Sequence, residues 1–533
     1  MTSKVILSSN YGSIHHETNS QPLPRTVFST FATFGLAFTN IGILSNLSAS
    51  FQTGILSGGP VTMISSWNVV AFFMLCIALS LAEICSAYPF NGIYYWAYEL
   101  VKQGGGPKSG KAAPFVAFVT GWIYCLAMII AAGSADLSVG ECMGMQLLIL
   151  ILLLTYNEPT ALAVASMIRM MSDGAVDLSM TTTLILAIAI LISHALLNVW
   201  NMQLISLLNE VSVWWSCGGL VVICAILAAF TPQHNDVWWV LTDYENYTGF
   251  TSVSYVVMLS MVCAAYTLFG CESVAQVAEE TEEADSAAPF AMVASIAVSW
   301  FVGLIFLFIL LLYTQDIQSI EQTQYEMPIA QLFLDAVGSR WTMVLLVILV
   351  VSQYFTGCTT ITLVSRLIFS LARDHAVPMS ERLSHVNDKA IPDNAVWAAT
   401  GFAIFFISPY PFSDFVFNAV LSATTVTANL TYAIVLLCRL IVPIKVRGRF
   451  SLGAFSTVIT ALGFIWTIFA VIAFILPTRW PITVDNFNYA SLGVTGVILF
   501  TLLNWWFWAK DHYHGPTAHI NLNHVYIPAT SVA

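Results

Sequence analysis

Apolar runs long enough to cross a lipid bilayer recur along this chain from Thr26 to Trp508. A helix needs about 20 mostly apolar residues to span the hydrocarbon core of a membrane. A soluble chain of 533 residues would instead form several domains with polar surfaces. Charged residues make up only 9% of this chain, against about 25% in soluble domains, so such surfaces could not be covered. The runs therefore predict an all-α integral membrane protein.

The apolar runs and their polar flanks divide the chain into twelve predicted spans. The third run is too long for one straight crossing, so we expect either one tilted helix with an extension outside the membrane or two short helices. The predicted spans cover residues 28–56, 60–86, 114–154, 180–199, 202–230, 252–277, 288–313, 341–370, 393–409, 413–440, 452–477 and 487–509.

The distribution of Lys and Arg predicts the orientation of the chain in the membrane. If both termini lie in the cytosol, only Arg169, Arg340 and Arg479 of the 17 Lys and Arg residues lie outside. Because positive residues are enriched in cytosolic loops, this orientation is the expected one. The acidic run at 279–285 also falls on the cytosolic side, but acidic residues contribute little to the rule.

The predicted outer segment 231–251 has no Lys or Arg and contains the sequon Asn246-Tyr247-Thr248. Asn246 is therefore a candidate glycosylation site. A second sequon begins at Asn429 within a predicted span, where it should be inaccessible.

Small and polar residues interrupt the middles of the first and sixth spans, within residues 33–43 and 265–273. Such residues permit local unwinding, which frees backbone N–H and C=O groups that are tolerated at membrane depth only where they line a cavity. Interruptions at corresponding positions of two halves indicate an inverted-repeat transporter with its site at the interruptions. The alternative is that the small residues only allow close helix packing. The binding candidates in these segments are Thr39, Asn40, Ile41, Gly42, Tyr266, Phe269, Gly270, Cys271 and Glu272.

Motifs that occur in order along nearly the whole chain resemble one known family. They include Gly54-Ile55-Leu56-Ser57-Gly58-Gly59-Pro60, Ala82-Glu83-Ile84-Cys85-Ser86-Ala87-Tyr88-Pro89, Ala278-Glu279-Glu280-Thr281 and Ala372-Arg373-Asp374. The chain thereby resembles the amino acid–polyamine–organocation (APC) superfamily in its fungal amino acid/choline branch. Within that branch it is most similar to the GABA permeases, with choline transporters close behind. The motif Gly92-Ile93-Tyr94-Tyr95-Trp96 resembles part of the superfamily's first cytosolic loop.

The resemblance implies a leucine-transporter-like fold, in which two five-helix repeats are inverted relative to each other and two helices follow. The implied organisation is a cytosolic tail at 1–27, a first repeat at 28–230, an outer loop and second repeat at 231–440, two further helices at 441–509 and a cytosolic tail at 510–533. Some members carry a Lys in the fifth helix that replaces a sodium ion. Span 202–230 has no Lys, and Glu210 is its acidic residue, so Glu210 is one candidate for coupling.

Ionisable residues inside membrane spans are functional candidates because burying them is costly. Asp136 lies near the middle of the third span, where it could pair with a substrate ammonium, carry a proton, or face an outer vestibule. Glu272 follows the second interruption, where it could neutralise an amine, take a proton, or cap a helix N-terminus. His194 is interpreted as a packing residue rather than a proton relay.

Further candidates lie in the eighth span and at the cytosolic ends of helices. Thr359 and Thr360 could face the first span and hold sodium, as in related folds, or bond to their own helix backbone. Glu83 and Arg373 could form gating ion pairs or extend their charged groups toward the membrane surface.

These patterns predict a secondary active transporter that imports a small amino acid or an amine such as GABA by proton symport, with sodium as the alternative ion. A choline or quaternary-amine carrier, which would need an aromatic cage, is the second hypothesis. A non-transporting nutrient receptor and a membrane enzyme are weaker alternatives, because the tails are short and no nucleophile–base or metal cluster stands out. We expect no cofactor, no metal and, at a net charge of -12, no nucleic-acid partner. The plasma membrane is the expected location, and the vacuolar or another internal membrane is the alternative.

Overall fold

The computed structural model describes residues 27–516, apart from residues 91, 106, 156–179, 324, 326, 413, 447 and 484–486. Arg169, residues 1–26 of the predicted N-terminal tail and residues 517–533 of the predicted C-terminal tail therefore lie outside the described residues. The described part is helical and contains no strand, only two isolated bridges. Its helices are α1 (Thr30–Ile41), α2 (Ile43–Leu56), α3 (Gly59–Ala87), α4 (Ile93–Gln103), α5 (Pro107–Thr155), α7 (Met180–Trp200), α8 (Met202–Phe230), α9 (Val237–Thr242), α10 (Val253–Thr267), η1 (Cys271–Glu280), α11 (Ala284–Tyr313), α12 (Ile317–Glu321), α13 (Ile329–Arg373), α14 (Ser380–Leu383), α15 (Asp393–Ile407), α16 (Asp414–Ile441), η2 (Gly453–Phe455), α17 (Ser456–Ile475), α18 (Ala490–Asn504), η3 (Trp505–Ala509) and α19 (Lys510–His512).

The predicted all-α membrane fold is confirmed. Within the described ranges, 11 helical segments are long and apolar enough to cross a bilayer. A shorter apolar helix, α15, occupies the position of the predicted ninth span. Together these segments account for the twelve predicted spans, and α8 has the predicted bounds.

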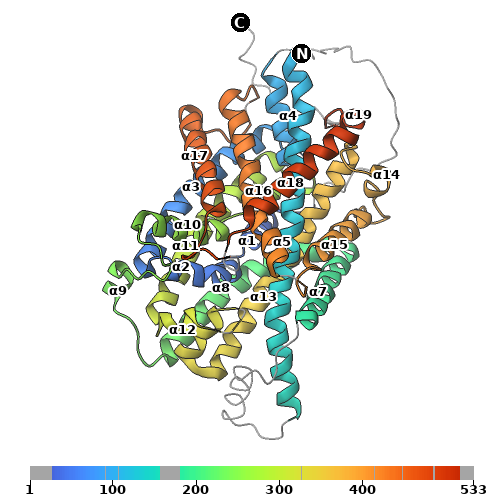
Figure 1. Ribbon diagram of the computed structural model, residues 1–533. Coiled ribbons are helices and arrows are strands. Elements are labelled where there is room, and N and C mark those ends of the chain that lie inside the picture. The colour runs from blue at the N-terminus through green and yellow to red at the C-terminus, as the bar shows by residue number, and fades with distance from the viewer. Residues whose placement is uncertain are drawn as a thin grey trace, which may run out of the picture.

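The third span is one helix, as in the first of the two alternatives. Helix α5 contains 49 residues, which at 1.5 Å per residue corresponds to about 74 Å. That is more than twice the roughly 30 Å thickness of the hydrocarbon core. Figure 1 shows the end of α5 projecting beyond the rest of the helices.

Two segments differ from the sequence prediction. The eighth span was expected at 341–370, but α13 begins at Ile329 and bends at Gly338, which has a φ of 73°. The segment with the motif of a cytosolic loop contains a helix, α4, directly after Gly92. Gly92 has a φ of 71°, and a Cβ there would lie 2.2 Å from Nε2 of Gln276. The positive φ favours glycine at this position, and a side chain there would also displace the Gln276 amide.

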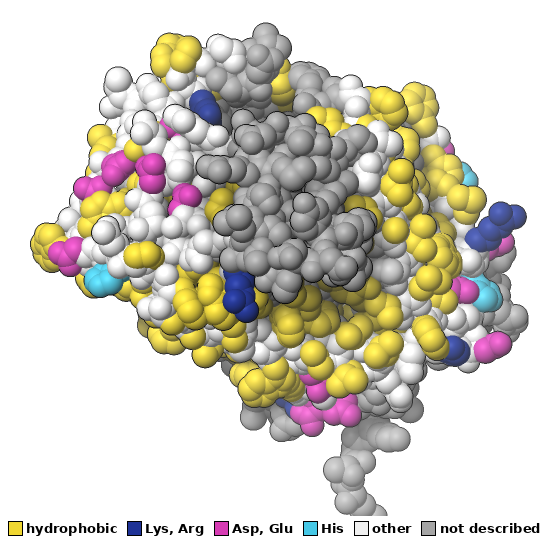
Figure 2. Space-filling view, turned by 90° about the horizontal axis from the view of Figure 1, so that it is seen from below, with side chains coloured by type: hydrophobic (Ala, Val, Ile, Leu, Met, Phe, Trp, Pro, Cys, Tyr) yellow, Lys and Arg dark blue, Asp and Glu magenta, His cyan; other side chains and the backbone are white. Residues whose placement is uncertain are grey.

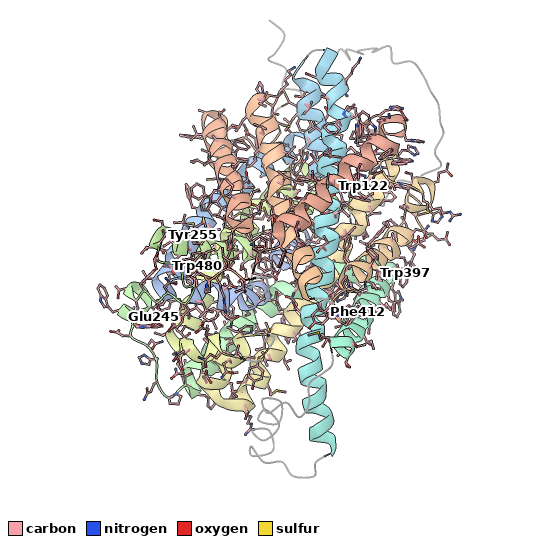
Figure 3. All side chains as sticks on the ribbon, viewed as in Figure 1. Trp122, Glu245, Tyr255, Trp397, Phe412 and Trp480 are labelled. Atoms are coloured by element: carbon pink, nitrogen blue, oxygen red, sulfur yellow. The ribbon has the colours of Figure 1, made fainter. Side chains whose placement is uncertain are left out.

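The two ends of the bundle are distinct in Figure 1: α4, α14 and α19 gather at one end, and α9 and α12 lie at the other. We call the first the cytosolic end and the second the outer end, following the distribution of Lys and Arg. Figure 2 views the outer end, where apolar side chains cover much of the rim and charged side chains lie between them in separate groups. Trp397 and Phe412, which are 44% and 87% exposed, lie on the outside of the bundle (Figure 3). In a membrane such side chains contact lipid rather than water.

The halves of the first and sixth spans lie at the centre of the bundle. Helix α1 packs against α8, α11, α13 and η1, while α2 packs against α10, α3 and α13. Phe28, just before α1, forms a bridge with Thr281, just after η1, and Ser57, just after α2, forms one with Asn246, in the loop before α10. The halves are therefore paired as α1 with η1 and α2 with α10, and the two interrupted spans meet at their interruptions.

Candidate functional site

Both interruptions predicted from the sequence are present, and each is formed at a glycine. Gly42 separates α1 from α2 with a φ of 57°, and Gly270 separates α10 from η1 with a φ of 105°. A Cβ on Gly42 would lie 2.8 Å from the Ser45 hydroxyl oxygen, and one on Gly270 would lie 2.5 Å from Nδ2 of Asn40. Both positions thus require a residue that adopts positive φ and has no side chain.

Asn40 connects the two interrupted spans. Its Nδ2 donates to the carbonyl oxygen of Gly270 and to the hydroxyl of Ser273, each at 3.1 Å. Its Oδ1 accepts a hydrogen bond from the Thr360 hydroxyl at 3.2 Å. One buried side chain therefore holds α1, η1 and α13 together at the depth of the interruptions.

The threonines of α13 hold this helix against two neighbours. The Thr356 hydroxyl donates to the carbonyl oxygen of Thr39 at 3.0 Å. The Thr360 hydroxyl shares its single proton between Asn40 Oδ1 and the carbonyl oxygen of Thr356, which lies 2.8 Å away. Thr359 turns to α8, where its hydroxyl donates to Oδ1 of Asn209 at 2.7 Å. Thr39 itself exchanges a hydrogen bond with Ser212 of α8. Thr360 therefore both bonds to its own helix and faces the first span, whereas Thr359 faces the fifth.

Glu272 is fully buried, and its carboxylate is held by two tyrosines. Tyr124 of α5 donates to Oε1 at 2.8 Å, and Tyr432 of α16 donates to Oε2. The ring of Phe269 lies 5.7 Å from that of Tyr432, centroid to centroid. Sequence reasoning did not identify these tyrosines, because they are far from Glu272 along the chain and lie in ordinary apolar runs.

Asp136 is also fully buried and does not face a vestibule. Its carboxylate lies 3.1 Å from Nδ1 of His194 on α7. His194, predicted from the sequence to be a packing residue, thus also contacts a carboxylate. Nothing in the local sequence indicated its proximity to Asp136. Ser138, two residues further along α5, faces a different direction and lines a cavity.

That cavity has a volume of about 350 Å³ and lies between α2, α5, α10 and α13, on the outer side of the interruptions. Of the predicted site residues, Tyr266 lines it. Gly42 is connected to it through Ser45, whose hydroxyl donates to the Gly42 carbonyl at 3.0 Å. The predicted residues Ile41 and Cys271 are buried. The polar lining consists of Ser45, Ser50, Thr53, Ser138, Tyr266 and Gln353.

Several ion pairs lie at the cytosolic end. Arg373 of α13 binds Glu279 of η1 through two hydrogen bonds of 2.8 and 2.7 Å. Arg366 of the same helix contacts Glu280 at 3.2 Å, with both side chains buried. Arg449 lies 2.8 Å from Glu283 and also contacts Asp285. The acidic run that opposed the positive-inside pattern is therefore largely paired with arginines.

The remaining predicted residues, Glu83, Glu210 and Asn246, lie apart from the cavity and from the two interruptions. Glu83 does not pair with Arg373; it contacts Arg439 at 3.5 Å, and also accepts a hydrogen bond from the Ser456 hydroxyl. Glu210 is half-buried on α8, where its neighbour Asn209 makes the contact with Thr359 instead. Asn246 is exposed near the outer end, and its Nδ2 donates to the carbonyl oxygen of Phe250 at 2.7 Å.

The chain is similar to known proteins over most of its length. The family model for amino acid permeases matches residues 28–500. The chain is 28% identical to the amino-acid permease BAT1 of Arabidopsis thaliana, across 92% of this chain and 93% of that protein. It is 24% identical to the GABA-specific permease of Saccharomyces cerevisiae, across 93% of this chain and 83% of the permease. It is also 24% identical to the choline transporter of the same yeast, across 92% and 83% of the two chains.

Proposed function

Because this chain belongs to the amino acid permease family and is therefore a multi-pass membrane transporter, we propose that it imports a small amino acid such as GABA together with a proton. The substrate would occupy the cavity lined by Ser45 and Tyr266, which belong to the two interrupted spans. The proposed membrane is the plasma membrane.

The cavity lining supports a substrate with no net charge. Hydroxyl and amide groups supply its polarity, and its described lining includes no Asp, Glu, Lys, Arg or His. An amino acid zwitterion carries one charge of each sign and can be held by dipoles. Helix α2 begins at Ile43 and offers a positive end for a carboxylate, while α10 ends at Thr267 and offers carbonyl groups to an ammonium.

A choline or other quaternary-amine substrate is the second candidate, because the GABA-specific permease and the choline transporter are equally similar to this chain. A quaternary ammonium group is bound best by several aromatic rings. Tyr266 and Phe474 are the aromatic residues in the described lining, and Glu272 already accepts two hydroxyl groups. Two aromatic residues do not form a cage around a quaternary ammonium group, and the Glu272 carboxylate is already occupied. The cavity therefore favours an amino acid over choline as the substrate.

The test is uptake of labelled GABA, other small amino acids and choline into cells that express the protein, with and without an inward pH gradient. We expect saturable amino acid uptake that a protonophore abolishes and that unlabelled choline does not inhibit. Uptake that follows a sodium gradient would contradict proton symport, and saturable uptake of choline alone would contradict the amino acid assignment. Cells with an empty vector give the background.

A further inference from the structure

Asp136 and His194 form an isolated ionisable pair inside the bundle. Both side chains are 0% exposed, and both carboxylate oxygens lie 3.1 Å from Nδ1 of the histidine. One N–H can donate fully to only one of these oxygens. Accordingly, Oδ1 of Asp136 and Nε2 of His194 have no hydrogen-bond partner among the described residues. A buried polar atom without a partner is rare and calls for an explanation.

Among the side chains that the structure describes, those around the pair supply no compensating charge. From α13, the titratable groups that face it are Tyr354 and Cys358. The Tyr354 ring centroid lies 4.3 Å from that of His194, and its hydroxyl shares a hydrogen bond with Ser193. On α15, which packs against α5 and α7, the titratable residue is Asp393 at the first position of the helix.

The charge of the pair therefore depends on how many protons it holds. With an ionised carboxylate and a neutral imidazole, the pair carries one negative charge; after binding one more proton it is neutral, whichever group takes the proton. An apolar interior disfavours an uncompensated charge. The site thus favours uptake of one proton, and the shared geometry lets either group accept it.

The pair is connected to the interrupted spans through one segment of α13. Gly357 lies so close that a Cβ there would be 2.2 Å from Oδ1 of Asp136. The adjacent Thr356 donates to the carbonyl oxygen of Thr39, and Thr360 donates to Asn40. Residues within one turn of the same helix thus contact the ionisable pair on one side and α1 on the other.

A second contact ties α7 to this segment. Nδ2 of Asn198, one turn after His194, donates to the carbonyl oxygen of Cys358 at 3.3 Å. Oδ1 of Asn198 accepts a hydrogen bond from the Thr362 hydroxyl at 2.7 Å. A change in the distance between α7 and α13 would therefore move the segment that holds Asn40.

We propose that the Asp136–His194 pair is the proton-binding site of the transport cycle and that α13 transmits its protonation state to α1 beside the substrate. This inference rests on the proposed proton symport. Substrate binding and proton binding then favour each other by the same factor, as linkage requires. Glu272 has a different role, because both of its oxygens already accept hydroxyl groups.

The test uses purified full-length protein in liposomes whose membrane potential is clamped at zero. With one proton per substrate, the wild type should accumulate substrate about tenfold per unit of pH gradient, and an internal pH dye should report proton entry. Asp136→Asn removes the carboxylate, so a proton on His194 would be an uncompensated buried charge and the site should stay neutral. His194→Gln leaves a lone buried carboxyl group, which should stay protonated for the same reason. Both variants should accumulate substrate to about the external concentration, move no protons, and retain exchange within about twofold of the wild type. His234→Gln, which alters an exposed histidine of the outer loop, is the matched control.

Each outcome of these experiments either supports or overturns the Asp136–His194 pair as the proton site. Coupled accumulation by both variants overturns the pair as the proton site while leaving proton symport intact. Equal loss of accumulation and exchange in folded variants assigns the pair a structural role and also overturns the inference. If the wild type itself moves no protons, proton symport fails and the inference fails with it. If the variants do not fold, infrared difference spectra of wild-type protein with isotope-labelled histidine provide the test: substrate addition should change the imidazole bands and a protonated-carboxyl band, and unchanged bands would overturn the proposal.

Discussion

At the scale of single residues, the two buried acids make different contacts and should respond differently to substitution. Glu272 accepts hydrogen bonds from Tyr124 and Tyr432, whereas Asp136 faces an ionisable histidine. An amide in place of Glu272 offers only one accepting oxygen, so one tyrosine O–H would lose its acceptor and would have to turn away from the amide NH2 group. An unsatisfied buried group of this kind costs about 1–3 kcal/mol.

For Glu272→Gln we expect substrate affinity to fall about five- to a hundredfold, equally in uptake and in exchange. The reason is that Glu272 holds η1 in place and does not carry the proton. Concentration dependence in both assays measures the effect. A variant that loses gradient-driven accumulation but keeps wild-type exchange would make Glu272 a proton carrier. Asn394→Ala, at an exposed asparagine of the cytosolic end, is a control for expression.

At the scale of elements, the interruptions of the first and sixth spans depend on glycine. Positive φ at Gly42 and Gly270 is strained for other residues, and a Cβ at either position meets atoms within 3 Å. Gly42→Leu and Gly270→Leu should abolish uptake while the protein still reaches the membrane. Gly218→Leu is the matched control, because nothing lies within 4 Å of a Cβ there. Labelled-substrate uptake, normalised to surface protein, is the measurement; normal uptake by both variants would mean that these glycines do not shape the site.

The pairing of α13 with η1 provides a second prediction at this scale. Arg373 and Glu279 form two short hydrogen bonds at the cytosolic end, and charge-assisted bonds of this kind contribute about 1.5–3 kcal/mol each. Arg373→Glu and Glu279→Arg should each reduce uptake at least tenfold by disturbing closure of this end. The double variant should recover a measurable part of the activity in a double-mutant cycle. Strictly additive losses would show that the ion pair has no role in closure.

At the scale of the whole molecule, the two ends of the bundle should lie on opposite sides of the membrane. The Lys and Arg residues gather toward the end with α4, α14 and α19, while the loop that contains Asn246 lies toward α9 and α12. Tags at both termini should therefore resist protease added to intact cells and be cleaved after permeabilisation. In a glycosylating host, an endoglycosidase should shift the wild type and not Asn246→Gln. Cleavage of either tag from outside would refute the predicted orientation.

The amino-acid sequence by itself determined the membrane class, the number of spans and the positions of both interruptions. These features are local, because the length of an apolar run decides whether a segment can cross a bilayer, and the absence of a side chain at Gly42 and Gly270 decides where the backbone can turn. The long third span could be recognised, but its continuity could not, since hydropathy does not distinguish one extended helix from two short ones.

Only the tertiary structure decided which polar side chains meet. Asp136 contacts His194 from 58 residues away, and Glu272 contacts Tyr124 and Tyr432 at separations of 148 and 160 residues. Such contacts depend on how each helix is rotated and how far it is shifted along its neighbours. Packing between helices sets both quantities, and hydropathy, which ranks residues one at a time, leaves them undetermined.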